Sequence, residues 1–172
     1  KFERIAKATV QNPWWNEFDK GLMTTEEVIE RFVESAPEYK KEIAEIYEHM
    51  DEIVTLYDYA VPWIRELKEK GYRIYILSNW SKPAYEANLE TNLCFLKEVD
   101  GAVMSFMEGV IKPDPQIYEL ICNRYEIDPK EAVFLDDNAD NIEGARAFGL
   151  NAIHFQTYEQ ARAELNNILE EK

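Results

Sequence analysis

The sequence predicts an α/β fold with a parallel sheet, preceded by a helical segment. From about residue 57 onward, short apolar runs that stop at polar turns alternate with segments of helical spacing, which is the pattern of βαβ units. The run at 132–135 is unbroken, as in strands buried on both faces. Before residue 57, apolar residues recur at helical spacing only. We therefore expect a helical part at 1–56 and an α/β part at 57–172.

Length and charge limit the partners of the chain. Its 172 residues suffice for a sizeable hydrophobic core. The 19 Lys and Arg residues face 34 Asp and Glu residues, and the resulting net charge of −15 opposes binding to nucleic acid or anionic membranes. An anionic substrate would meet the same repulsion, so its site needs local positive charge or a bound metal ion. The absence of a long apolar run or signal peptide predicts a cytoplasmic protein.

The helical part begins with apolar residues at helical spacing over 2–10. Thr24 and Glu27 have the spacing of a capping box, which predicts the start of another helix. Pro37 fits the first turn of a third helix. We expect these helices to form a small bundle.

The α/β part contains four predicted strands. Gly71 fits the left-handed position that ends a helix, and the first strand follows it. Helices are expected before the first strand, between the strands and after the last one, where a closing helix starts at about Tyr158. The predicted strands are 72–77, 101–104, 132–135 and 152–155.

Polar side chains follow three of the apolar runs. In parallel sheets, ligand crevices open at the carboxyl ends of strands. Asp136 and Asp137 are adjacent carboxylates that repel each other there, and a hard cation such as Mg²⁺ compensates them with oxygen ligands. The alternative is that Asp137 or Asn138 only caps the next helix.

The polar residues that follow the other two apolar runs are suited to binding an oxyanion. Ser78 and Asn79 offer a hydroxyl, an amide and backbone N–H groups to a phosphoryl oxygen. Lys112 precedes Pro113, whose ring forces the lysine backbone into an extended conformation. Each pattern alone is ordinary loop chemistry. Their combination with the aspartate pair, in this order, is much more specific.

Three segments resemble motifs of the haloacid dehalogenase-like (HAD) hydrolase superfamily: ILSN at 76–79, IKPDPQIYEL at 111–120 and FLDDNADNIEGARAFG at 134–149. The last segment is similar in particular to bacterial glucose-1-phosphate phosphatases and to the phosphatase domain of soluble epoxide hydrolases. The resemblance implies a Rossmann-like three-layer parallel sheet, with a four-helix-bundle cap of the C1 type at 1–56. It also implies Mg²⁺-dependent hydrolysis of small phosphate monoesters through an aspartyl-phosphate.

Roles for individual residues follow from the same resemblance. Ser78 would hydrogen-bond the transferring phosphoryl group, and Lys112 would offset charge on the nucleophile and the phosphate. Asn79 and Trp80 would line the substrate side. The implied partner is a small phosphorylated metabolite, bound by a monomer or homodimer.

The resemblance also implies a magnesium site. Asp136 and Asp137 would hold Mg²⁺ directly or through water, and Asn141, one helical turn further on, would support that site. Two other functions stay open. One is a metal-independent 2-haloacid dehalogenase, against which the aspartate pair argues because uncompensated carboxylates would hinder an attacking carboxylate. The other is a non-catalytic HAD-fold binding protein.

The first motif of the family is not found in the sequence. That motif is a hydrophobic strand ending in Asp-x-Asp, which supplies the nucleophile, the general acid and a metal ligand and normally precedes the cap. Asp19 does not follow an apolar strand, so we reject it as the nucleophile. The family's first strand lies between the strands that end at Ser78 and Asp136. We therefore expect residues 1–172 to belong to a longer chain or to form a rearranged sheet, and to be catalytically inactive alone.

Overall fold

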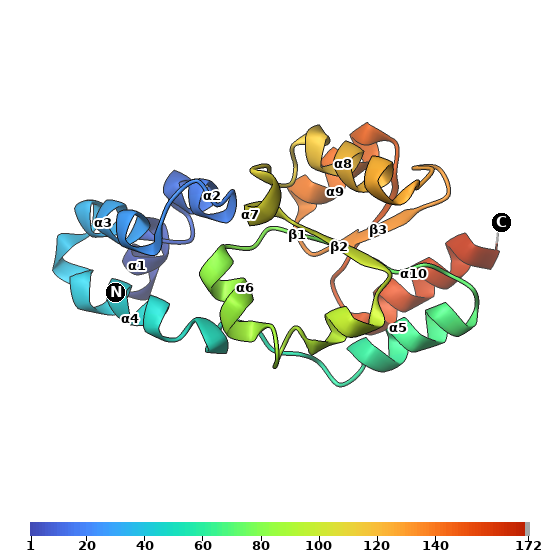
Figure 1. Ribbon diagram of the computed structural model, residues 1–172, viewed down its shortest axis with the longest axis horizontal. Coiled ribbons are helices and arrows are strands. Elements are labelled where there is room, and N and C mark those ends of the chain that lie inside the picture. Colours follow the sequence, from blue (N-terminus) through green and yellow to red (C-terminus); the bar gives the residue numbers. More distant parts are fainter. Residues whose placement is uncertain (171–172) are drawn as a thin grey trace. The chain divides into compact units, whose positions relative to one another are not determined.

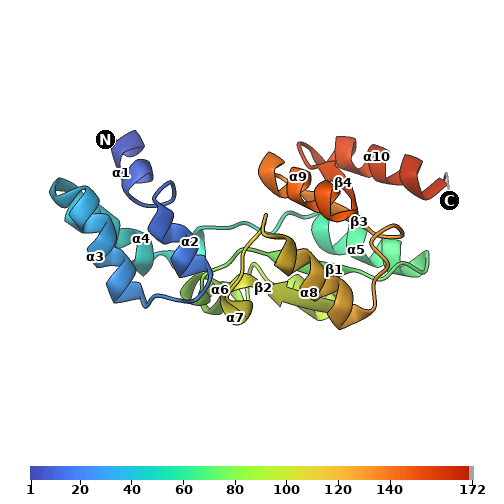
Figure 2. The ribbon, with the colours of Figure 1, turned by 90° about the horizontal axis from the view of Figure 1, so that it is seen from above.

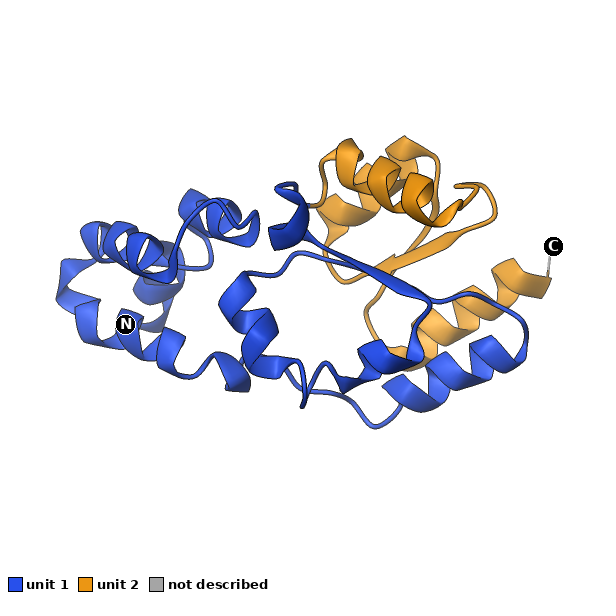
Figure 3. Cartoon of the chain, in the orientation of Figure 1, with its two compact units in different colours: residues 1–111 blue, residues 112–172 orange. Residues whose placement is uncertain are grey.

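The computed structural model describes residues 1–170, which form two compact units (Figures 1 and 3). The first unit contains residues 1–111, and the second begins at Lys112. The four strands of the described residues form two parallel pairs, β1–β2 and β3–β4. The α/β class with parallel strands is confirmed. The three-layer sheet, the division at residue 56 and the cap type stay predictions.

The first unit starts with a helical region, seen in blue and cyan in Figure 1. Its core contains Phe18, Val28, Phe32 and Ile43, and the ring of Trp15 stacks on Phe32 at a centroid distance of 6.2 Å. Its α-helices are α1 (Phe2–Ala8), α2 (Pro13–Asp19), α3 (Thr25–Ser35) and α4 (Lys40–Glu48), with 3-10 turns at Pro37–Tyr39 and Met50–Glu52.

The predicted capping box is confirmed at the start of α3. The Glu27 N–H donates to Thr24 Oγ1 at 3.2 Å, and the Thr24 N–H donates to Glu27 Oε2 at 2.8 Å. Pro37 begins a 3-10 turn, which continues directly into α4 at Lys40. Proline restricts the residue before it, and Ala36 is accordingly outside the helical region, with φ −152° and ψ 71°.

The rest of the first unit contains a strand pair. The Ser78 end of β1 lies opposite the Met104 end of β2. Residues 72–74 were predicted as strand but lie outside β1, because the pairing with β2 begins at Tyr75 and Gly101 and the Ile74 N–H donates to the Asp100 side chain, at 2.7 Å, rather than to a strand carbonyl. The elements are α5 (Ala60–Glu69), β1 (Tyr75–Ser78), α6 (Lys82–Asn88), the 3-10 helix Cys94–Glu98, β2 (Gly101–Met104) and α7 (Ser105–Glu108).

In the second unit, helices pack around the strand pair β3–β4. Figure 1 shows α8 and α9 on one side of this pair and α10 on the other, and Figure 2 shows α9 and α10 beside β4. The predicted strands and the closing helix are confirmed. The elements are α8 (Pro115–Tyr125), β3 (Val133–Asp136), α9 (Ala139–Phe148), β4 (Asn151–His154) and α10 (Tyr158–Glu170). Within residues 1–170, no helix is long and apolar enough to cross a membrane.

A close contact joins α2 to α7 within the first unit. The Ser105 hydroxyl donates to the Asp19 carbonyl oxygen at 2.6 Å. Gly21 has φ +71°, and a Cβ atom at that position would lie 2.5 Å from the Phe106 carbonyl oxygen. Glycine is therefore required both by the backbone conformation and by the closeness of α7.

The carboxyl group of Asp19 is buried at the end of α2. Burial raises its pKa to about 7, although a hydrogen bond with the Trp15 side chain opposes part of that rise. The folded state therefore holds a proton that the unfolded state releases near pH 4. Consequently, the stability contributed by this group is highest below about pH 4 and is lost as the pH rises toward 7.

We expect Asp19→Asn to remove this pH dependence. The amide keeps the shape of the carboxylic acid but cannot ionise, so the variant should gain stability relative to the wild type between about pH 5 and pH 8. At about 1.4 kcal/mol per pKa unit, the two units from pH 5 to the folded-state pKa of about 7 give a gain of at most roughly 3 kcal/mol between these pH values. Urea unfolding midpoints at both pH values measure it. Asp58→Asn, which changes an exposed aspartate, is the matched control. An equal pH dependence in the wild type and both variants would contradict the prediction.

Candidate active site

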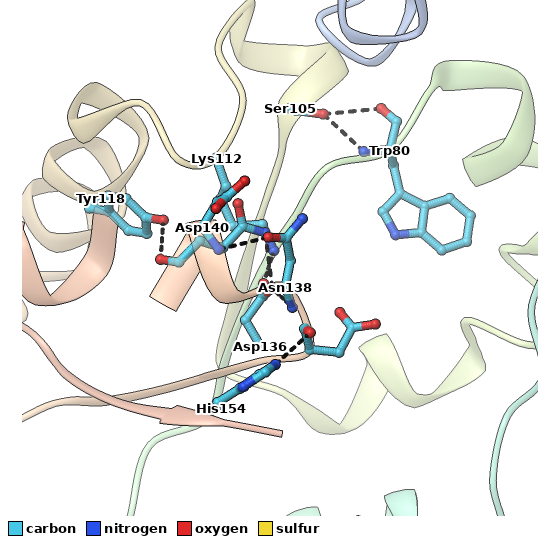
Figure 4. Close-up of polar contacts among 10 residues, drawn as sticks. Trp80, Ser105, Lys112, Tyr118, Asp136, Asn138, Asp140 and His154 are labelled. Atoms are coloured by element: carbon cyan, nitrogen blue, oxygen red, sulfur yellow. Dashed lines mark hydrogen bonds and ion pairs between the residues drawn. The ribbon is translucent and has the colours of Figure 1, made fainter. Parts of the chain in front are cut away.

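Asp136 is buried at the carboxyl end of β3 and accepts three hydrogen bonds. Its Oδ2 accepts from Lys112 Nζ at 2.5 Å. Its Oδ1 accepts from the Asn138 N–H and from Asn141 Nδ2, each at 2.9 Å. Figure 4 shows Lys112, Asp136 and Asn138 close together in this region. The negative charge of Asp136 is therefore compensated at both oxygens.

Lys112 is the cation of this cluster. Its side chain is 7% exposed and that of Asp136 is 6% exposed, so the ion pair is largely removed from water. The ammonium also lies 5.4 Å from the centre of the Phe134 ring, whose negative face attracts cations. The sequence predicted a charge role for Lys112 but not its pairing with Asp136.

The start of α9 fixes the other donors. Asn138 is the N-cap residue, and its side chain accepts the Asp140 N–H at 2.8 Å. Capping is therefore performed by Asn138, which leaves the Asp137 side chain exposed for other contacts. The Asp137 carbonyl oxygen lies 2.9 Å from His154 Nε2, which holds this turn against β4.

Tight packing between α8 and α9 supports Asn141. The Tyr118 hydroxyl donates to the Asn141 carbonyl oxygen at 2.8 Å. Burial, assisted by the charge of Asp136, raises the pKa of Tyr118, so it remains a donor. A Cβ atom at Gly144 would lie 2.8 Å from the Pro113 Cβ. Sequence reasoning missed both residues, although a glycine inside a helix was a usable signal for close packing.

The predicted magnesium ligands fit that ion by chemical type. Asp136, Asp137 and the amide oxygen of Asn141 are hard oxygen donors, and Mg²⁺ is commonly bound by one or two carboxylates plus water and phosphate oxygens. Among residues 1–170, no group of three Asp, Glu, His or Cys side chains is placed to hold a metal ion. Magnesium binding by the aspartate pair stays a prediction.

Ser78, Asn79 and Trp80 lie in the first unit, at and after the end of β1. No hydrogen bond is assigned to the Ser78 hydroxyl within the described chain. The Trp80 N–H donates to Ser105 Oγ at 2.9 Å, and this oxygen also lies 3.2 Å from the Trp80 carbonyl oxygen. Ser105 therefore fixes the turn after Ser78, a role that its sequence context did not reveal. The structure brings Lys112, Asp136 and Asn141 into one cluster, while the Asp137 carboxylate remains outside it.

Curated relatives include both hydrolase types that the sequence suggested. (S)-2-haloacid dehalogenase 4A of Burkholderia cepacia is 31% identical over 58% of the chain, and bifunctional epoxide hydrolase 2 of Rattus norvegicus is 33% identical over 59%. The matches span 43% and 19% of these relatives, respectively. Sesquiterpene phosphatase astK of Aspergillus oryzae is 24% identical over 84% of the chain and 74% of its own length.

A solved structure shares the fold. It is a HAD family enzyme from Bacteroides thetaiotaomicron in complex with magnesium and inorganic phosphate. It is 21% identical, has a TM-score of 0.70 and covers 92% of this chain and 88% of its own. In addition, the family model for haloacid dehalogenase-like hydrolases matches residues 6–149. The chain therefore belongs to the haloacid dehalogenase-like hydrolases.

Proposed function

We propose that the whole protein hydrolyses small phosphate monoesters with Mg²⁺. The observation that carries this proposal is the cluster of Lys112, Asp136 and Asn141 beside the exposed Asp137. It combines a buried cation with oxygen donors at one strand end, as an anionic substrate and a magnesium ion require. The magnesium and phosphate bound by the Bacteroides enzyme, and the phosphatase among the relatives, support it.

Each residue has a defined part in this proposal. Lys112 offsets negative charge on the nucleophile and on the phosphoryl group. Asn141 and the Asn138 N–H hold Asp136 in one orientation. Ser78 donates to a phosphoryl oxygen. When bound to the aspartate pair, magnesium would polarise the phosphoryl oxygens.

The substrate and the nucleophile complete the proposal. Asn79 and Trp80 contact the organic part of the substrate, a small phosphorylated metabolite. The aspartate of the family's first motif, which residues 1–172 do not contain, is the proposed nucleophile. Its carboxylate would attack the phosphorus as the ester P–O bond breaks and the alcohol leaves, and water would then hydrolyse the aspartyl-phosphate to release phosphate.

A 2-haloacid dehalogenase is the second candidate, since one relative has that activity by name. Its substrate carries a carboxylate, which the exposed charge of Asp137 would repel without a metal ion. Assays of the complete gene product decide between the candidates. We expect phosphate release from a panel of phosphate monoesters with Mg²⁺ and its loss in EDTA. Metal-independent halide release from 2-chloropropionate, without phosphate release, would instead establish the dehalogenase.

Asp137→Asn tests the aspartate pair. Because Asp137 is exposed, the variant of the complete protein should keep its melting temperature. Loss of one negative ligand should weaken Mg²⁺ binding and lower turnover at least tenfold. Magnesium titration of the rate of phosphate release measures both effects, with Asp58→Asn as the control for an exposed aspartate. Unchanged magnesium affinity and turnover would refute the metal role of Asp137.

Lys112→Met tests the buried ion pair. Removing the ammonium leaves Asp136 buried without its cation, which typically costs about 3–5 kcal/mol, so both stability and turnover should fall. The double variant Lys112→Met/Asp136→Asn removes both charges and should recover much of the stability, but not the turnover. Thermal unfolding and phosphate release distinguish the two roles. Full activity of Lys112→Met would show that the lysine is purely structural.

A further inference from the structure

A cavity of about 270 Å³ lies within the first unit, with Ser78 in its wall. Ile76 and Ser78 of β1 and Met104 of β2 line one side of it. Ser78 pairs with Met104, and Ile76 lies two residues before Ser78, so these side chains share one face of the strand pair. Leu56 and Tyr59, from the segment that enters α5, line the cavity as well.

The remaining walls are mainly apolar. Trp80, Leu93 and Phe95 contribute large side chains, and no lysine or arginine among residues 1–170 lines the cavity. Its polar side-chain groups belong to Thr55, Tyr57, Tyr59, Ser78, Trp80 and Asn92. Both polar atoms of the Asn92 side chain already form hydrogen bonds. Its Oδ1 accepts the Leu56 N–H at 3.3 Å, and its Nδ2 donates to Asn88 Oδ1 at 2.9 Å.

We propose that this cavity binds the apolar organic group of the substrate, so that the preferred substrates are monophosphates of alkyl, prenyl or aryl alcohols. This inference rests on the proposed function, because it places the phosphoryl group at Ser78. The Ser78 hydroxyl then marks the boundary between the phosphate and the organic group. Trp80, which the sequence placed on the substrate side, lines the same cavity.

The chemistry of the walls disfavours polar substrates. Sugar hydroxyls would lose hydration beside Leu56, Phe95 and Met104, whose side chains offer them no hydrogen-bond partner. A nucleotide or a diphosphate would bring further negative charge into a cavity that has no cation in its lining and belongs to a chain with a net charge of −15. A single phosphate on an apolar group brings less negative charge to the cavity and no hydroxyls that need partners.

The volume sets the size of the group. An apolar cavity of about 150 Å³ accommodates a benzene molecule. A cavity of about 270 Å³ therefore admits a larger ring or a chain of several carbons. Each buried methylene strengthens binding by roughly fourfold, so kcat/KM should rise with chain length and then level off when the cavity is full.

Kinetics of the complete gene product with a series of n-alkyl phosphates test this proposal. With Mg²⁺ present, kcat/KM should increase at least tenfold from methyl to hexyl phosphate and should be higher for hexyl phosphate than for glucose-1-phosphate. Ala60→Trp places a large ring at a residue that lines the cavity and should reduce the hexyl-to-methyl ratio at least fivefold. Ala87→Trp, at an exposed position of α6, is the matched control and should keep the ratio.

Calorimetry with hexylphosphonate, which is not hydrolysed, separates the cavity from the chemistry. Hexylphosphonate binding that weakens in Ala60→Trp but not in Ala87→Trp would support the role of the cavity, whether or not any ester is hydrolysed. Absence of ester hydrolysis together with such binding would overturn only the proposed function. Hydrolysis with equal kcat/KM for all chain lengths would overturn the inference and leave the proposed function standing. Absence of hexylphosphonate binding would also overturn the inference.

Discussion

The buried ion pair between Lys112 and Asp136 is the interaction on which the second unit's site depends. Removing two charges from water costs several kcal/mol for each ion, and their attraction repays this only when the remaining hydrogen-bonding capacity is also satisfied. Here the Asn138 N–H and the Asn141 side-chain amide donate hydrogen bonds to the second carboxylate oxygen of Asp136. The ion pair and these hydrogen bonds therefore hold together the turn before α8, the end of β3 and the start of α9.

The residues around this ion pair are closely packed. The turn containing Pro113 can approach α9 closely because Gly144 has no side chain, and Tyr118 occupies the adjacent space while donating to Asn141. These contacts limit the positions that Lys112 and Asp136 can adopt. Rigid neighbours hold the charges of such a site in place, as the proposed electrostatic stabilisation of a phosphoryl group requires.

Local features were predictable from the sequence, whereas long-range contacts were not. The capping box of Thr24 and the apolar run before Asp136 depend on neighbours within a few residues, and both were found. The start of β1 was misplaced because strand length depends on a partner strand distant in sequence. The Lys112–Asp136 pair and the bridging role of Ser105 join residues 24 and 86 positions apart, which no local pattern reveals.

The acidic composition limits the ways in which this chain can attract an anion. Exposed cations of this chain have acidic neighbours, as in the pairs of Arg65 with Glu98 at 2.6 Å and Lys68 with Asp100 at 2.9 Å. Such exposed cations are also screened by water, so they attract an anion only weakly. The buried ammonium of Lys112 is also paired, with Asp136 Oδ2 at 2.5 Å, so this ion pair adds no net positive charge. In the proposed function, Mg²⁺ bound by the aspartate pair would therefore supply the positive charge that a phosphate requires in a chain with a net charge of −15.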